Sequence, residues 1–213
     1  MFELIKTGGW LMAPIMACSL VAATIIFERL LALRRARVLP ERLVAILRRW
    51  SEQGAITAAD MQSLALDSPL GRIVAMGLAN RDRGREVLRE RVEDTGRHVA
   101  HELERFLNTL GTIAAISPLL GLLGTVSGMI KIFQIVSVQG NSNFSLLSVG
   151  IAEALVTTAA GLSVAIPSLL FYRYFQGRVT SLVVGMEQET LHLIDLLDAR
   201  ASAGTVLPGE QPT

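Results

Sequence analysis

Residues 106–172 read FLNTLGTIAAISPLLGLLGTVSGMIKIFQIVSVQGNSNFSLLSVGIAEALVTTAAGLSVAIPSLLFY, and only Lys131 and Glu153 among them are charged. A helix needs about 20 apolar residues to cross the hydrocarbon core of a bilayer. The polar patch QGNSN at residues 139–143 divides this stretch into two runs of sufficient length, and its composition is typical of a short loop. The stretch therefore predicts two antiparallel membrane-spanning helices.

A third run without charge covers residues 7–27, and 51% of the 213 residues are hydrophobic. The mean hydropathy of +0.45 is too high for an ordinary soluble domain of this size. We expect an all-α integral membrane protein with three transmembrane helices and long helices extending into the cytoplasm. The expected segments are an N-terminal segment with the first span (1–29), a cytoplasmic helical loop (30–105), the second span (106–136), a periplasmic loop (137–146), the third span (147–174), a cytoplasmic C-terminal helix (175–200) and a disordered tail (201–213).

Positive charge gives the expected orientation. Of the 20 Lys and Arg residues, 15 lie between Arg29 and Arg105 and three follow the third span, whereas residues 137–145 contain none. By the positive-inside rule both basic clusters are cytoplasmic, so the N-terminus lies outside. A cleavable signal peptide is disfavoured, because its positive charges precede the apolar run and here they follow it.

The predicted cytoplasmic segments are helical in pattern. Proline and glycine are expected to break the loop into shorter helices at Pro40, Gly54, Pro69, Gly71 and Gly84. The periodic apolar positions from Val87 to Phe106 predict a helix that runs unbroken into the second span. A further apolar stripe follows the third span, and neighbouring subunits or the cytoplasmic loop are its natural partners. Its members are Val179, Leu182, Val183, Met186, Leu193, Ile194 and Leu197.

In the second span, glycines bracket Thr125 in the run GLLGTVSG. Small residues at this spacing let helices approach closely in lipid. One interpretation is that Gly121, Gly124 and Gly128 form only a packing face and that Thr125 bonds its own helix backbone. Pro118 frees backbone carbonyls, which then need an internal partner or water.

The third span contains Glu153 within an otherwise apolar run. A carboxylate facing lipid would cost about 2.5 kcal/mol or more, so we expect it to face protein or water. Two structural interpretations compete with a functional one: Glu153 reaches the outer interface, or it pairs with Lys131. Thr157 shares its helix face and Thr158 does not, so periodicity alone favours Thr157.

Other chemistries lack support in the sequence. His98 and His101 have a spacing that could hold a metal, but no Cys or third His joins them. The glycine run lacks the Lys of a phosphate loop, and basic residues in the loop alternate with acidic ones, which disfavours nucleic acid. No His or Asp lies within the spans, so we expect no enzyme, no cofactor and no metal site.

Two motifs carry a resemblance. The runs GTIAAISPLLGLLGTVSGMIKIF (111–133) and GIAEALVTTAAGLSVAIPSLLFYRYF (150–175) resemble the core of the MotA/TolQ/ExbB proton-channel family, with the ExbB branch closest. The match is specific over residues 111–176 and looser elsewhere. The count of three spans argues against the MotA branch, whose members have four.

The resemblance implies pore-facing threonines at Thr125 and Thr158 and a pore-side carboxylate at Glu153, so it prefers Thr158 to Thr157. It places Gly161 with Pro118 and the three glycines of the second span in helix packing near the pore. It further implies a ring of five chains around two single-span ExbD-like helices, each with an intramembrane aspartate, in the bacterial inner membrane. Such a ring would use proton-motive force to energise a TonB-like protein for outer-membrane transport. A TolQ-type subunit of the Tol-Pal system and a non-conducting membrane scaffold are the alternatives.

Overall fold

The computed structural model describes residues 9–40, 43, 58–80, 84–139 and 144–204. All regular secondary structure in these ranges is helical. Three helical segments are long and apolar enough to cross a membrane, namely Met12–Ala32, Arg85–Gln134 and Ser148–His192. This confirms the predicted all-α fold with three candidate spans.

The described residues form two compact units. The first contains the chain up to Leu30 together with Phe106–Gln176, and the second contains Leu31–Arg105 together with the chain from Gly177 onward. Helix α9 (Phe144–Gly204) contributes to both. The two predicted spans from residue 106 to residue 174 therefore belong to the first unit.

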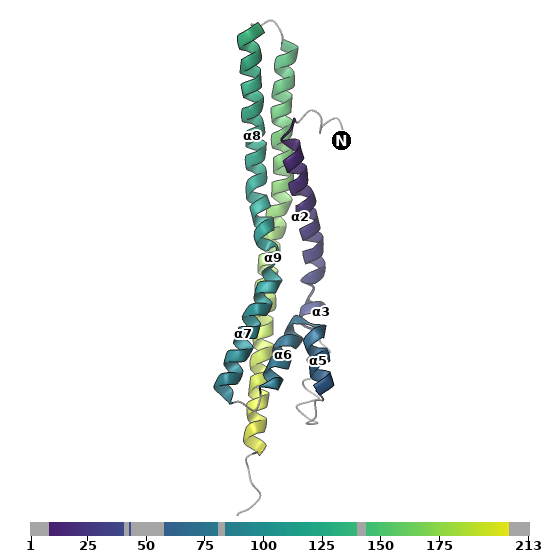
Figure 1. Cartoon of the computed structure of the whole chain (residues 1–213), viewed down its shortest axis with the longest axis vertical. Coiled ribbons are helices and arrows are strands. Elements are labelled where there is room, and N and C mark those ends of the chain that lie inside the picture. The colour runs from purple at the N-terminus through teal and green to yellow at the C-terminus, as the bar shows by residue number, and fades with distance from the viewer. Residues whose placement is uncertain (1–8, 41–42, 44–57, 81–83, 140–143, 205–213) are drawn as a thin grey trace, which may run out of the picture. The chain divides into compact units, whose positions relative to one another are not determined.

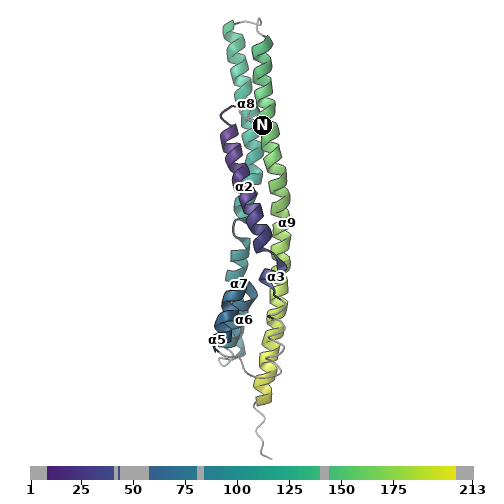
Figure 2. The ribbon, with the colours of Figure 1, turned by 90° about the vertical axis from the view of Figure 1, so that its right-hand side faces the viewer.

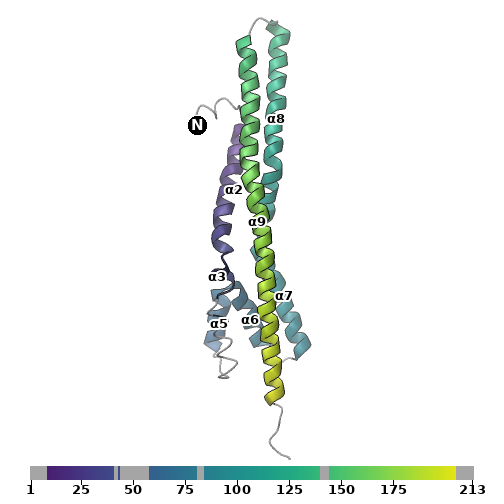
Figure 3. The same ribbon diagram turned by 180° about the vertical axis from the view of Figure 1, so that it is seen from behind.

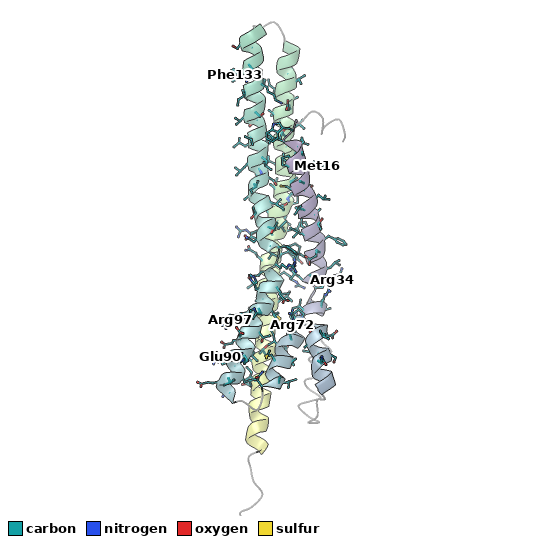
Figure 4. The ribbon with its side chains drawn as sticks, viewed as in Figure 1. Met16, Arg34, Arg72, Glu90, Arg97 and Phe133 are labelled. Carbon is teal, nitrogen blue, oxygen red and sulfur yellow. The ribbon has the colours of Figure 1, made fainter. Side chains whose placement is uncertain are left out.

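The first unit contains α2 (Met12–Ala32), α8 (Leu107–Gln139) and the first part of α9. Helices α8 and α9 run side by side as a hairpin, and α2 lies alongside it (Figures 1 and 2). Many large apolar side chains of this unit are exposed, including Leu119 and Phe133, and Phe133 points away from the hairpin in Figure 4. A surface of this kind suits contact with lipid or with neighbouring helices. The middle of the predicted loop, residues 140–143, lies outside the described residues.

The expectation of an unbroken helix from Val87 into the second span is wrong. Helix α7 (Arg85–Glu104) ends at the extended backbone of Arg105, and α8 begins at Leu107. Between them Phe106 has a φ of 64°, a left-handed conformation that is rare for a bulky residue. The guanidinium of Arg29 lies 5.4 Å from the centre of the Phe106 ring, a distance typical of a cation–π contact. Since α7 is highly charged, the membrane-spanning part of this segment lies in α8.

The second unit is built from short helices that pack on one another. They are α3 (Arg35–Val38), α5 (Ala58–Asp67), α6 (Pro69–Ala79) and α7, together with the end of α9. Ser68 caps α6 by accepting a hydrogen bond from the Gly71 amide at 3.0 Å, and Pro69 takes the first helical position, where it costs no hydrogen bond. Gly84 precedes α7 with a φ of 87°.

Gly71 does not break the chain as predicted. It lies inside α6 and faces the backbone of Leu64 in α5, where an added Cβ would come 3.0 Å from the carbonyl carbon of Leu64. The glycine is therefore needed for close packing of α5 on α6, and the break between these helices occurs at Ser68.

Among the described side chains of the apolar stripe after the third span, Val179, Leu182, Met186 and Ile194 are buried; those of Leu193 and Leu197 lie outside the described ones. Ile73 of α6, Val92 of α7 and Met186 of α9 line one groove of about 450 Å³, and Figure 3 shows these helices together. Of the two partners that the sequence allowed for this stripe, the structure shows the loop. Helix α9 continues to Gly204 and so includes the first residues of the predicted tail, while residues 205–213 lie outside the described residues.

Candidate functional site

Glycines bring the backbones of α8 and α9 into direct contact. A Cβ added at Gly161 would lie 2.6 Å from the Ser117 carbonyl oxygen, and one added at Gly121 would lie 3.0 Å from the Cα of Thr158. At Gly124 an added Cβ would lie 2.7 Å from the Cβ of Thr157. Real Cβ atoms almost never approach other atoms within 3.0 Å, so no larger residue fits at Gly161 or Gly124 without a shift of the surroundings.

Gly128 and Pro118 also lie in α8, on either side of Gly121 and Gly124. A Cβ at Gly128 would meet the Cβ of Ala154 at 3.0 Å, which extends the contact between the helices toward the Glu153 end of α9. Pro118 is half-buried inside α8. Its ring nitrogen has no hydrogen to donate to the carbonyl of Ala114, so α8 lacks one backbone hydrogen bond beside Gly121.

The three threonines have different surroundings. Thr158 donates a hydrogen bond from Oγ1 to the carbonyl oxygen of Gly121 at 3.0 Å and thereby links α9 to α8. Thr157 is 1% exposed, packs against Gly124, and donates to the Glu153 carbonyl at 2.7 Å within its own helix. Thr125 donates to the Leu122 carbonyl at 2.7 Å, which is the backbone bond expected of a threonine in an apolar helix.

Glu153 is bonded to Lys131 across the hairpin. The Nζ of Lys131 lies 2.6 Å from the Oε1 of Glu153. The side chain of Glu153 is 20% exposed and that of Lys131 is 46% exposed. The pairing with Lys131, which the sequence left open as one alternative, is therefore present in the structure.

Gly9 covers the same carboxylate from the N-terminal side. An added Cβ at Gly9 would overlap Oε1 and would lie 3.1 Å from the Cδ of Glu153. Gly9 also has a φ of 69°, and its carbonyl accepts a hydrogen bond from the amide of Met12 at the start of α2. Sequence reasoning missed this contact, although the Gly-Gly pair at residues 8 and 9 is a signal for a tight turn before the first span.

Ser117 is a second residue that sequence reasoning missed. It is 0% exposed, and its hydroxyl has no hydrogen-bond partner among the residues that the structure describes. Ser117 lies four residues before Gly121, hence on the same face of α8, and this spacing was the available signal. An unpaired buried hydroxyl is costly, so a water or a further helix is a natural partner for it.

The arrangement combines one titratable acid with hydroxyl groups in an apolar hairpin. Glu153 is the only acidic residue between Phe106 and Tyr172, and Lys131 is the only basic one. Threonine hydroxyls both donate and accept hydrogen bonds but do not titrate near neutral pH. The site can therefore exchange a proton at Glu153 and orient water or a partner's polar group at the threonines. His98 and His101 lie exposed on α7, in the second unit.

Comparison with known proteins finds relatives whose similarity includes this hairpin. A model of the MotA/TolQ/ExbB proton channel family matches residues 65–188, more than half of the chain. An ExbB-like biopolymer transport protein of Synechocystis is 33% identical over 169 residues, which are 78% of this chain and 66% of that relative.

Two further relatives match a shorter part. The biopolymer transport protein ExbB of Salmonella typhimurium is 39% identical over 94 residues, 44% of this chain and 37% of the relative. The Tol-Pal system protein TolQ of Haemophilus influenzae is 38% identical over 93 residues, 44% of this chain and 39% of the relative. The chain thus spans less than two thirds of the length of each of these three relatives.

Proposed function

The chain belongs to the MotA/TolQ/ExbB proton channel family, and we therefore propose that it is the proton-channel subunit of an ExbB-type energy-transducing complex in the bacterial inner membrane. The observation that carries the proposal is the Glu153 carboxylate, 20% exposed and bonded to Lys131 at 2.6 Å, in residues 106–172, which hold no other charged side chain. Charged groups at membrane depth are costly and mark ion paths or proton relays. Replacing an ion pair inside a protein by apolar residues is often neutral or stabilising, so a chain that served only as a scaffold would not need this pair.

The proposed path uses Glu153, Thr158 and Thr125. Glu153 exchanges a proton, while the hydroxyls of Thr158 and Thr125 turn from their backbone carbonyls to water or to a partner's carboxylate. Each of these hydroxyls makes one backbone bond, so turning costs about 1 kcal/mol. A proton that crosses the membrane releases about 2.3 kcal/mol per 100 mV, which covers one such step.

The proposed complex contains partner chains that supply an intramembrane aspartate. We place several copies, most simply five, in a ring around single-span ExbD-like chains, whose intramembrane aspartate completes the path. The exposed apolar residues of the hairpin, such as Leu122 and Leu155, suit contacts with neighbouring copies and lipid. A TonB-like protein would receive the mechanical work that proton passage performs on this complex. The distribution of Arg and Lys supports a periplasmic N-terminus and a cytoplasmic C-terminus.

Paired substitutions at Thr158 test the proposal. Thr158→Val keeps the shape of the side chain and removes the hydroxyl, whereas Thr158→Ser keeps the hydroxyl. We expect T158V to lower proton flux about fivefold or more in proteoliposomes of the complex, since a hydrogen bond of about 1 kcal/mol is lost from the path, and T158S to retain most of it. Thr95→Val is the control, because Thr95 lies half-buried on α7, in the second unit, and its hydroxyl donates to the Arg91 carbonyl within its own helix. Equal proton flux in T158V and T95V would contradict the proposal.

A TolQ-type role is the second candidate, favoured by the similarity to the Haemophilus influenzae TolQ. The two roles share the proton path and differ in the protein that receives the work. Expression of the chain in cells that lack either system separates them, because an ExbB-type subunit restores energy-dependent outer-membrane uptake and a TolQ-type subunit restores envelope integrity. A membrane scaffold would show no proton flux with any partner.

A further inference from the structure

Lys131 places a fixed positive charge beside the carboxylate of the proposed path. It lies on α8 and bonds Glu153 of α9, and no other basic residue occurs between Phe106 and Tyr172. The paired acid is only 20% exposed, while Lys131 is 46% exposed. The lysine is thus the more exposed partner of the pair, and its long side chain lets the ammonium move away when the bond to Glu153 opens.

Two described neighbours of Glu153 hinder the binding of a metal cation at its Oε1. A metal cation exchanges its hydration shell for several oxygen ligands, and a carboxylate supplies the negative charge among them. Here Oε1 is held by the Lys131 ammonium, and the backbone of Gly9 covers the same oxygen. The pair carries no net charge, so the attraction of Glu153 for a passing cation is strongly reduced.

We propose that Lys131 determines the ion specificity of this chain, holding the acid in an ion pair that protons can open and metal cations such as Na⁺ cannot. The inference rests on the proposed function as an ion-conducting subunit. A proton adds to the Glu153 carboxylate and releases the ammonium of Lys131, which keeps its own three protons. When the proton leaves for the next acceptor, the carboxylate is restored and the ion pair forms again.

The effect of the lysine charge is large enough to measure. A unit charge about 6 Å from a passing cation, at an effective dielectric constant near 20, lowers the occupancy of that cation about a hundredfold. Lys131→Gln removes the charge and keeps a hydrogen-bond donor for Glu153, so the carboxylate is not left without a partner. Lys131→Arg keeps the charge and serves as the matched control.

The experiment measures two fluxes in the same vesicles. Proteoliposomes of the purified complex that contains the full chain are given a membrane potential, and internal pH and internal Na⁺ are followed by separate dyes. We expect proton flux with only background Na⁺ flux in the wild type and in K131R, and Na⁺ flux about a hundredfold above that background in K131Q. The double variant K131Q/E153Q should lose this Na⁺ flux, because the carboxylate that would bind the ion is gone.

The outcomes separate this inference from the proposed function. Absence of proton flux in the wild type, while the complex is intact, overturns the proposed function and this inference with it. Proton flux in the wild type combined with no Na⁺ flux in K131Q overturns the role of Lys131 alone. Na⁺ flux above background in the wild type or in K131R also overturns the role of Lys131. This test can be made even if the K131Q variant does not assemble. Equal Na⁺ flux in K131Q and K131Q/E153Q overturns the charge argument.

Discussion

Replacing Gly161 by alanine would force α8 and α9 apart where their backbones are in direct contact. The new Cβ would lie 2.6 Å from the Ser117 carbonyl oxygen and 3.1 Å from the Cα of Gly121. Both obstacles are backbone atoms, so a rotamer change cannot relieve the contact and the helices must separate by several tenths of an ångström. Overpacking of this kind costs about 1–3 kcal/mol. The better helix propensity of alanine returns about 0.5–1 kcal/mol of that.

Gly177→Ala is the matched control, because Gly177 lies in the same helix and an added Cβ there meets no atom within 4 Å. We expect G177A to be slightly stabilising and G161A to be destabilising, with a difference near 2 kcal/mol between them. The assay is denaturant-induced unfolding of the detergent-solubilised protein followed by circular dichroism. Equal stability of the two variants would refute the close contact between the helix backbones.

A rescue experiment distinguishes side-chain from backbone obstruction. Gly124→Ala would meet the side chain of Thr157, so the additional change Thr157→Gly, which removes that side chain, should lessen the damage. The additional change Ser117→Gly should not help G161A, because the obstacle there is the carbonyl oxygen of Ser117. Rescue of G161A by S117G would show that the contact was assigned to the wrong atoms.

Three further predictions concern sites outside this contact. Gly9→Ala combines a positive φ with a Cβ that overlaps the Glu153 carboxylate, so it should cost about 1–3 kcal/mol in the same unfolding assay, whereas Gly177→Ala costs nothing. Phe106→Leu should destabilise by about 0.5–1 kcal/mol by removing the cation–π contact with Arg29, and a double-mutant cycle with Arg29→Met that shows no coupling would contradict this. The hydrogen bond from Arg72 lowers the pKa of Glu102 below its ordinary 4.5, so the pair adds stability above that pH and loses it as the pH falls through the lowered pKa. Because the Glu102 side chain is 57% exposed, the contribution is at most about 1 kcal/mol, and Glu102→Gln should remove this part of the acid dependence of unfolding.

The sequence predicted the features that depend on local composition. It did not predict features that depend on tertiary contacts between helices. Three apolar runs were enough to predict the three candidate spans. The lone carboxylate in such a run was enough to mark Glu153, and Lys131 was foreseen as one of its possible partners. The break at Phe106 was missed because neither glycine nor proline occurs there, and a left-handed phenylalanine has no signal in the local pattern.

One error and one limit of periodicity have the same cause. Gly71 was interpreted as a helix breaker, but its role is to let α5 approach α6. Periodicity correctly placed Thr157 on the face of Glu153, yet periodicity gives no information on what packs against that face. In the structure Thr157 lies against Gly124, and it is Thr158 that bonds across the hairpin.

The contact of Gly9 with Glu153 has a consequence for biosynthesis. The turn that starts α2 is synthesised before the carboxylate that it covers, because Glu153 is on the third of the three candidate spans. The first span can therefore enter the bilayer early but cannot complete its packing until the hairpin has followed. A newly made chain interrupted before Glu153 would lack this contact, and its first span would be held by fewer contacts than in the finished chain.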